Sequence, residues 1–446
     1  MHRARDTHRP DGRDGPARGS DDGVSDLFLA AGAPSLQCCD RCGASWPELS
    51  TAAECADCGG LLLVTHARPV ATGDALKIAL ASSAEASGVW RHRALVMPGA
   101  DQVVSWPEGN TPLVDRARVS EYAGVAQLQI KHEGMNPTGS FKDRGMTVAV
   151  THAVRAGARA VACASTGNTA ASLAAYAAQA GIPALVFVPK GNISAGKLAQ
   201  AMAYGATTLM VNGDFDACLA LARSASAKLG VYLANSLNPW RLEGQKTIVW
   251  ELLAQLDWNT PDWIALPAGA LGNTSAFGKA LREALALGLI NRLPRLLVVQ
   301  AEGAAPFARA FDADFAKRVT VRAETVATAI RIGDPASWDR AVRAIRETNG
   351  VVTSVTDAEI LDAKAVIDAS GVGCEPASAA SVAGVRSMVA RGLIVASEQV
   401  VCVLTGHVLK DPDAVNFYHA DGATRATLPL EIEPRLSDVE RILGRR

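Results

Sequence analysis

The sequence predicts an α/β protein built on parallel sheets, with a small cysteine-rich module near its amino terminus. Of its 446 residues, 49% are hydrophobic but only 5% are aromatic, and 39 are glycine. Buried aliphatic strands and tight turns give this composition. Short aliphatic runs alternate with alanine-rich amphipathic stretches from about residue 67 onward, which is typical of βαβ units. At the usual ~150 residues per domain, the length suffices for two or three domains.

Composition divides the chain into three parts. Residues 1–33 mix both charges with glycine and proline and lack the apolar stretch of a secretory signal, which predicts a disordered tail. Residues 34–66 form the cysteine-rich module, and residues 67–446 form the α/β region. We find no internal repeat in the sequence.

Within the α/β region, aliphatic runs mark the expected strands and amphipathic runs mark the expected helices. The expected strands are 160–164, 184–188, 207–211, 264–266, 296–299 and 400–404. The expected helices include 169–180, 195–204, 215–229 and 275–287. Their alternation predicts a mainly parallel sheet that helices cover on both faces.

The balance of charges argues against a global polyanion-binding surface. Lysine and arginine number 44 and the acidic residues 45, which leaves a formal net charge of −1. We therefore expect no nucleic-acid partner and no membrane partner. The uncharged stretch Ala160–Pro189 is too rich in hydroxyls and amides, and too broken by Pro183, for a membrane span. Any anion must bind at a local site.

Five of the nine cysteines lie between Cys38 and Cys58. Cys39 and Cys42 form one CxxCG knuckle, and Cys55 and Cys58 form a second. Two such knuckles place four thiolates around one tetrahedral ion, so we predict a structural Zn²⁺ site rather than a redox pair or unliganded thiols. Cys38 is an alternative to Cys39 as a ligand. A site of four cysteines leaves no open position for a substrate, so its expected role is to fold a module that lacks a core.

The other four cysteines stand singly in apolar or small-residue surroundings. Buried reduced thiols of this kind, with no recognisable secretory signal, predict a cytoplasmic protein. The cysteine-rich module is not basic and has no row of aromatic residues beyond Trp46, which favours a structural role over nucleic-acid binding.

Polar clusters follow three of the expected strands. These clusters are Ser165–Thr169, Gly269–Asn273 and Thr405–His407. Ligands gather at the carboxyl ends of strands in open parallel sheets, so we expect the three clusters to line one crevice.

The second cluster has the form of a phosphate-binding loop. Its residues Gly269, Ala270, Leu271, Gly272 and Asn273 lead into an expected helix, where backbone N–H groups and the helix dipole can hold a phosphate dianion. The loop matches neither a Walker sequence nor GxGxxG, which disfavours nucleotide binding.

The first cluster has groups suited to an amino-acid substrate. Ser165, Thr166, Asn168 and Thr169 offer hydroxyls, an amide and helix-start N–H groups, which can hold a carboxylate and a phenolic oxygen. Lys142 stands between small residues before a helical stretch. A phosphate loop, a lysine and a carboxylate site together suit a pyridoxal phosphate enzyme that acts on an amino acid.

Several segments resemble threonine synthase, a member of the fold type II pyridoxal phosphate enzymes. They are EGMNPTGSFKDRG (133–145), ASTGNTAAS (164–172), NSLNPWRLEGQK (235–246), TAIRIGDPASW (328–338), EPASAAS (375–381) and TGHVLKDP (405–412). The matches run in order from about Thr111 to Pro412, and the cysteine-rich module resembles a zinc ribbon that some members carry. The resemblance implies a two-domain enzyme with the cofactor in the cleft and a smaller subdomain at about 135–235 inserted in the larger one.

The resemblance also assigns roles at the cofactor. Lys142 is expected to form the Schiff base and move protons, Asn168 to bind the ring oxygen, and Thr405 to face the pyridine nitrogen. The loop 269–273 is expected to hold the cofactor phosphate, although Ala270 stands where the family usually has Asn.

At the substrate, the resemblance assigns Ser165, Thr166 and Thr169 to the amino-acid end. Ser236 and Arg241 are expected to bind the phosphate of O-phospho-L-homoserine.

Three further residues are expected to support the site rather than to react. Asp143 and Arg144 are expected to orient the Lys142 loop, and Glu375 to cap a helix or to orient another group.

The implied reaction converts O-phospho-L-homoserine and water to L-threonine and phosphate by γ-elimination and β-addition. The alternatives are a threonine dehydratase, a cysteate-synthase-like enzyme, or a zinc-ribbon binding protein on a retired scaffold. The expected partner is a small amino-acid phosphate, and the expected assembly is a homodimer.

Overall fold

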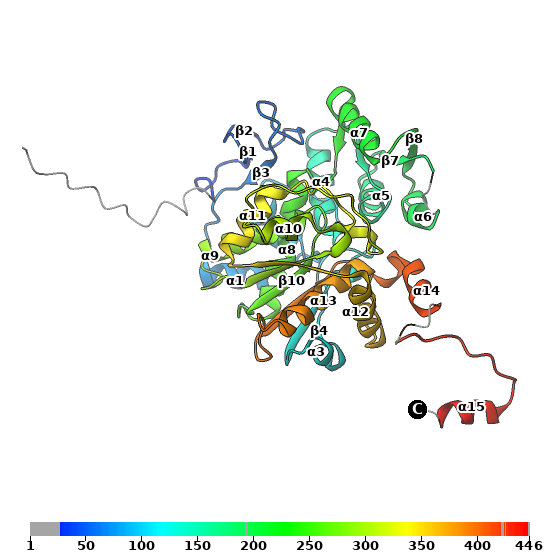
Figure 1. The fold of residues 1–446 in the computed structure, drawn as a ribbon. Coiled ribbons are helices and arrows are strands. Elements are labelled where there is room, and N and C mark those ends of the chain that lie inside the picture. Colours follow the sequence, from blue (N-terminus) through cyan, green and yellow to red (C-terminus); the bar gives the residue numbers. More distant parts are fainter. Residues whose placement is uncertain (1–26, 192–194, 421–422, 424, 445–446) are drawn as a thin grey trace, which may run out of the picture.

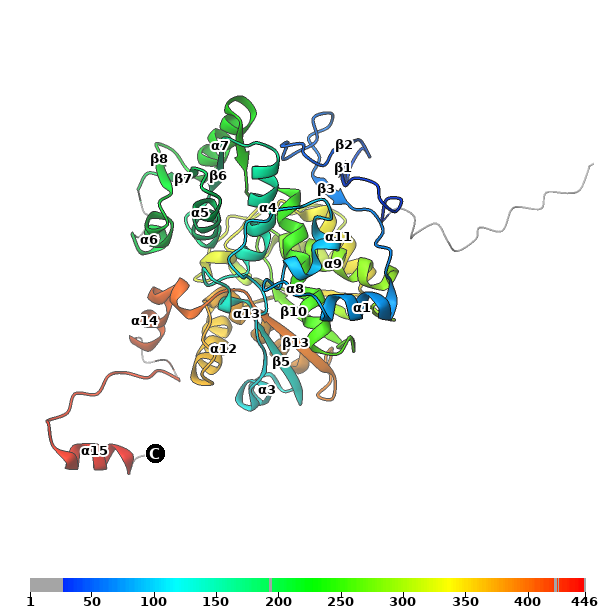
Figure 2. The ribbon, with the colours of Figure 1, turned by 180° about the vertical axis from the view of Figure 1, so that it is seen from behind.

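A computed structural model describes residues 27–191, 195–420, 423 and 425–444, so most of the predicted tail 1–33 lies outside the described residues. The described chain forms a small antiparallel ribbon and two larger α/β layers (Figures 1 and 2). The ribbon contains β1 (Leu36–Cys39), β2 (Ser45–Pro47) and β3 (Leu62–Thr65), in the order β2-β1-β3. Among the described helices, none combines the length and apolarity needed to cross a membrane.

The larger sheet has six strands in the order β12-β11-β10-β13-β5-β4. Its strands are β4 (Leu113–Asp115), β5 (Gln127–His132), β10 (Trp263–Pro267), β11 (Arg295–Ala301), β12 (Val351–Val355) and β13 (Gln399–Leu404). All neighbours pair in parallel except β4 with β5. The carboxyl ends of β10 and β13, which the sequence marks with polar clusters, are therefore side by side.

The smaller sheet has four parallel strands in the order β8-β7-β6-β9. They are β6 (Ala160–Ala164), β7 (Ala184–Pro189), β8 (Thr207–Val211) and β9 (Val231–Leu233). This sheet spans residues 160–233, and the proposed domain boundaries, including a subdomain at about 135–235, stay predictions.

The α-helices fill the layers around these sheets. In chain order they are α1 (Gly73–Ala81), α2 (Arg93–Val96), α3 (Ala117–Ala123), α4 (Lys142–Arg155), α5 (Asn168–Ala180), α6 (Ala195–Ala203), α7 (Phe215–Leu229), α8 (Pro239–Gln255), α9 (Gly272–Ala286), α10 (Pro306–Phe311), α11 (Trp338–Glu347), α12 (Asp357–Ala369), α13 (Pro376–Ala390), α14 (Pro412–Ala420) and α15 (Leu436–Leu443). Short 3₁₀ helices are η1 (Trp90–His92), η2 (Glu133–Met135), η3 (Glu302–Ala304), η4 (Thr328–Ile330) and η5 (Val408–Lys410).

The predicted α/β class is confirmed, and each of the ten expected strands and helices forms within a few residues of its expected bounds. Helices cover both faces of the larger sheet, as its alternating side chains show. On β10, Ile264 and Leu266 join the core beneath α8 and α9, whereas Trp263 and Ala265 join the core beneath α12 and α13. Burial on both faces is why these strands are continuously aliphatic.

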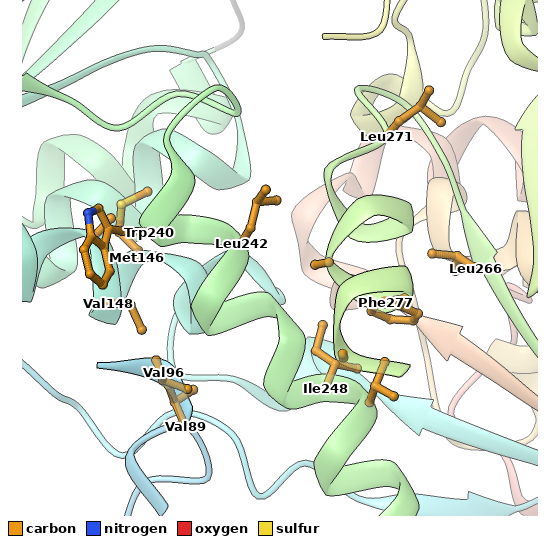
Figure 3. Close-up of a cluster of buried hydrophobic side chains, with 14 of the residues drawn as sticks. Val89, Val96, Met146, Val148, Trp240, Leu242, Ile248, Leu266, Leu271 and Phe277 are labelled. Carbon is orange, nitrogen blue, oxygen red and sulfur yellow. The ribbon is translucent and has the colours of Figure 1, made fainter. Parts of the chain in front are cut away.

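Helix α8 lies in the middle of the largest core. Figure 3 shows Trp240 of α8 beside Met146 and Val148 of α4, with Phe277 of α9 on the other side. Every residue of α8 from Pro239 to Leu253 is buried. Because this helix is buried on all sides, it has no apolar stripe for the sequence pattern to reveal.

Candidate active site

Lys142 is the first residue of α4, and hydrogen bonds hold it at the carboxyl end of β13. The Phe141 N–H donates to the Thr405 carbonyl at 3.0 Å, and Ser140 forms a β-bridge with Gly406. The Lys142 Nζ lies 3.8 Å from the centre of the Phe141 ring. Burial, and then the charge of Arg241, lower the pKa of Lys142 to about 7, while Glu375 opposes this shift. The neutral and the charged forms of the Lys142 amine are therefore both well populated near pH 7.

Buried hydrogen bonds fix the first turn of α4. The Asp143 carboxylate accepts from the Thr138 N–H at 2.7 Å and from the Ser172 hydroxyl at 2.6 Å. Arg144 pairs with Glu133 and with Glu251, each at 2.7 Å. These contacts agree with the prediction that Asp143 and Arg144 orient the Lys142 loop.

Helices α4 and α8 approach closely because both carry glycine at their crossing. A Cβ on Gly244 would lie 1.7 Å from the Arg144 carbonyl oxygen, and one on Gly145 would lie 2.9 Å from the Arg241 carbonyl oxygen. A side chain at Gly244 would force the helices apart. This close approach is what brings Lys142 and Arg241, on different helices, into one electrostatic neighbourhood.

Arg241 is a buried cation without a carboxylate partner among the described residues. One of its Nη groups donates to the Ala234 carbonyl at 3.1 Å, and its Nε has no hydrogen-bond partner in the described part of the chain. Burial lowers the pKa of Arg241 to about 10. A buried guanidinium that has an unpaired N–H group and no neighbouring carboxylate favours the binding of an anion, because the anion would satisfy both the N–H group and the charge. Half-buried Ser236 lies in the turn just before α8.

Asn235 joins this turn to the predicted amino-acid site. Its side-chain amide exchanges two 3.0 Å hydrogen bonds with the backbone of Ala164, at the end of β6. The half-buried residues Ser165, Thr166 and Thr169 follow directly, around the start of α5. The structure therefore places the end of β6, which these hydroxyls follow, beside the turn that precedes the Ser236–Arg241 segment.

Asn168, Glu375 and Thr405 meet between the two sheets. The Asn168 side-chain amide donates to the Glu375 carboxylate at 3.0 Å, and the Thr405 hydroxyl lies 3.0 Å from the Ser378 hydroxyl and 3.5 Å from Glu375. Burial raises the pKa of Glu375, although Asn168 and the nearby lysines Lys410 and Lys142 oppose this. Glu375 occupies the N-cap position of α13, but its side chain makes no capping hydrogen bond there, so of the two predicted roles the contacts favour the orientation of another group. Glu375 orients Asn168.

The loop Gly269–Asn273 leads into α9 from the carboxyl end of β10. Leu271 adopts a left-handed conformation (φ 65°) at the helix start, and no side chain caps the first turn. Two buried hydroxyls beside this turn, Thr274 Oγ and Ser337 Oγ, have no partner among the residues that the structure describes. Uncapped N–H groups and unused hydroxyls match what a phosphate group accepts, so a phosphate fits this loop.

The phosphate loop also touches the helices that carry the other groups. A Cβ on Gly272 would lie 3.6 Å from Gln245 of α8, and the same Gln245 contacts Gly145 of α4. The three predicted clusters follow strands of two sheets rather than of one, and that they line one crevice stays a prediction. Sequence reasoning did not single out Ser337 or Gln245; the sole signal for them was their place inside the matching segments.

The four predicted zinc ligands also lie together. The Sγ atoms of Cys39, Cys42, Cys55 and Cys58 are all within 4.8 Å of one another, in the ribbon turns. Cys38 is not in this group and lies near the Thr65 hydroxyl. Four thiols at this spacing suit a tetrahedral metal ion.

Comparisons with known proteins agree with this arrangement. The family described as "Pyridoxal-phosphate dependent enzyme" matches residues 104–406. A threonine synthase of Methanosarcina acetivorans is 48% identical over 84% of this chain and 92% of its own length. A threonine synthase of Methanocaldococcus jannaschii is 42% identical over 92% and 99%.

The fold also has a solved counterpart. Threonine synthase from Escherichia coli superimposes with a TM-score of 0.67 at 18% identity, over 91% of this chain and 94% of that one. The chain thus belongs to the pyridoxal-phosphate dependent enzyme family and, within it, to the threonine synthases.

Proposed function

We propose that this protein converts O-phospho-L-homoserine and water to L-threonine and phosphate, with pyridoxal phosphate as cofactor. The observation that carries the proposal is Arg241. A cation buried without a carboxylate partner in the described chain, next to the lysine at the centre of the site, calls for an anionic ligand. The phosphate loop accounts for one anion, and Arg241 for a second. A substrate that carries its own phosphate supplies that second anion.

The cofactor would be held by residues of both sheets. Lys142 would carry it covalently, Gly269–Asn273 would bind its phosphate, and Asn168 and Thr405 would contact its ring. The two unused hydroxyls, Thr274 Oγ and Ser337 Oγ, support the phosphate assignment. When bound, pyridoxal phosphate supplies an electron sink that stabilises negative charge on the substrate carbon chain.

The substrate would lie between α5 and α8. Ser165, Thr166 and Thr169 would hold its amino-acid end, and Ser236 and Arg241 would hold its phosphate. Arg241 would bind that phosphate most tightly as it leaves the γ-carbon and gains charge.

Lys142 would move the protons. With a pKa of about 7, its amine can take a proton and give it back near neutral pH. It would remove one proton from the α-carbon and one from the β-carbon as phosphate leaves, and then deliver a proton to the γ-carbon, which becomes the methyl group. Water would then add its hydroxyl at the β-carbon, its proton passing to Lys142 or to the released phosphate, and Lys142 would return a proton to the α-carbon. Asn168 and Glu375 hold the neighbouring wall of the site rigid through their 3.0 Å hydrogen bond.

A substrate panel tests the proposal. The purified protein with pyridoxal phosphate and O-phospho-L-homoserine should release phosphate and threonine in equal amounts. Formation of 2-oxobutyrate from threonine would instead indicate a dehydratase, and sulfite-dependent phosphate release from O-phosphoserine a cysteate-synthase-like enzyme. Identical absorbance spectra of the wild type and Lys142→Ala with pyridoxal phosphate would show that Lys142 does not bond to the cofactor, and would favour a binding protein on a retired scaffold.

We further propose that Cys39, Cys42, Cys55 and Cys58 bind a structural Zn²⁺. The mutual distances of their Sγ atoms support this set over one that includes Cys38. A homodimer in the cytoplasm stays a prediction, and light scattering on the purified protein tests its assembly.

A further inference from the structure

The first cysteine knuckle is bound to the catalytic region by buried charge. Asp40 directly follows Cys39 in this knuckle. Its carboxylate accepts a hydrogen bond from the guanidinium Nε of Arg340 and a second, at 3.2 Å, from Arg343. Both arginines belong to α11, and Figures 1 and 2 both place the ribbon beside this helix. The Arg340 side chain is only 5% exposed, so Asp40 is the partner that its charge needs.

Helix α11 in turn supports the phosphate loop. Ser337, which directly precedes α11, donates its N–H to the Ala270 carbonyl at 3.2 Å and accepts from the Ser275 hydroxyl at 3.3 Å. Farther along, a Cβ on Gly278 of α9 would lie 2.4 Å from Ala344 Cβ, so α9 and α11 touch without intervening side chains. A displacement of α11 would therefore also move the phosphate loop and α9, the helix that follows this loop.

The end of the ribbon is anchored to α8 and α9. His66, just after β3, lies 2.9 Å from Glu243 of α8, and Lys279 of α9 donates to the Val64 carbonyl. The ribbon's own core consists of Cys39, Cys55 and Leu62, with only two partly buried neighbours. So small a core cannot fix the knuckle by itself, and the bound metal must do it.

We propose that the first knuckle positions the phosphate loop, through Asp40, α11 and Ser337, so that zinc in the ribbon and pyridoxal phosphate in the site bind with positive coupling. This inference rests on the cofactor and zinc binding proposed above. It gives the ribbon a function in cofactor affinity, beyond the folding of its own module. Asp40, Arg340 and Ser337 are positioning residues here.

The second knuckle offers a matched control. Asp57 also lies between the two cysteines of its knuckle, Cys55 and Cys58, one position later than Asp40 does in the first knuckle. It is exposed and forms no ion pair or hydrogen bond with any residue that the structure describes. Asp40→Asn and Asp57→Asn therefore make the same chemical change in two knuckles, and only the first breaks the link to α11.

The test measures cofactor affinity in excess zinc, with zinc content determined alongside. We expect Asp40→Asn to raise the Kd for pyridoxal phosphate roughly tenfold, since a lost charge-assisted hydrogen bond is commonly worth a factor of this order. Asp57→Asn should match the wild type. Pyridoxal, which lacks the phosphate, should bind to Asp40→Asn and wild type within about a factor of two, because the coupling runs through the phosphate loop.

Equal pyridoxal phosphate affinity in Asp40→Asn and Asp57→Asn would overturn the inference, and so would an equal loss of affinity for pyridoxal and pyridoxal phosphate. If Asp40→Asn does not fold, the coupling between the two sites can still be measured on the wild type. Coupling is reciprocal, so bound pyridoxal phosphate must tighten zinc binding, measured against a chelator. An unchanged zinc affinity overturns the inference. A wild type that binds no pyridoxal phosphate would instead defeat the proposed function itself.

Discussion

Replacing Arg241 with methionine should make the protein more stable and much less active. The guanidinium is buried without a carboxylate partner in the described chain, and its pKa, lowered to about 10, means that folding disfavours its charge at every lower pH. A lowering of this size corresponds to a penalty of about 3 kcal/mol. Methionine loses the hydrogen bond to Ala234, at about 1 kcal/mol, but fills similar space. The net expectation is a gain of about 1–2 kcal/mol in the free energy of unfolding.

The same substitution should remove the contact between Arg241 and the leaving phosphate. A charge-assisted, bidentate contact contributes about 2–3 kcal/mol or more, so kcat/KM for O-phospho-L-homoserine should fall roughly 100-fold. Inorganic phosphate should stabilise the cofactor-free wild type more than it stabilises Arg241→Met.

Urea unfolding of the cofactor-free proteins and steady-state phosphate release are the assays. Arg144→Met is the matched control, because Arg144 is equally buried on the neighbouring helix but is paired with Glu133 and Glu251. Removing it leaves the buried Glu133 carboxylate without a cation among the described residues and leaves Glu251 with Lys131 alone, so the control should lose about 3–5 kcal/mol. A destabilised Arg241→Met that keeps its kcat/KM would refute the reasoning.

Three further predictions concern the lysine, the helix crossing and the metal. The rate at which the cofactor-free protein captures pyridoxal phosphate should rise with pH through a midpoint near the Lys142 pKa of about 7 and level off above it, because the neutral amine is the reacting form. A stopped-flow rate that keeps rising to pH 9 would contradict this. Gly244→Ala should cost on the order of 3 kcal/mol in urea unfolding, since its Cβ would lie 1.7 Å from the Arg144 carbonyl oxygen; a cost below about 1 kcal/mol would argue against so tight a crossing. Metal analysis should find zinc in the wild type and in Cys38→Ser but not in Cys55→Ser, and a zinc-free wild type would discard the metal site.

Local patterns in the sequence predicted the strands and helices whose apolar residues follow one regular pattern along the element. The strand Ala160–Ala164 and the helix Phe215–Leu229 form at their expected bounds. The strand is buried along its whole length, and the helix buries Cys218, Ala222 and Ala225 at helical spacing. Helix α8 was missed because its buried surface includes Glu243, Lys246 and other charged residues that are neutralised only by partners on other elements. No local pattern distinguishes such a helix from an exposed one.

The candidate site shows the same division. Lys142 and the phosphate loop are contiguous motifs, and the sequence identified them. The meeting of Asn168 with Glu375 joins residues far apart in the chain, and only the packing of two sheets against each other creates it.

By itself, the sequence determined the α/β class, the expected chemistry and the cysteine pairs, because each depends on motifs whose residues are close together along the chain. The tertiary structure alone decided that Arg241 has no carboxylate partner among the described residues, that α4 and α8 cross at Gly244, and that Asp40 reaches α11. The physical reason is that the cost of a buried charge depends on which partners surround it. Those partners come from distant segments that only folding brings together.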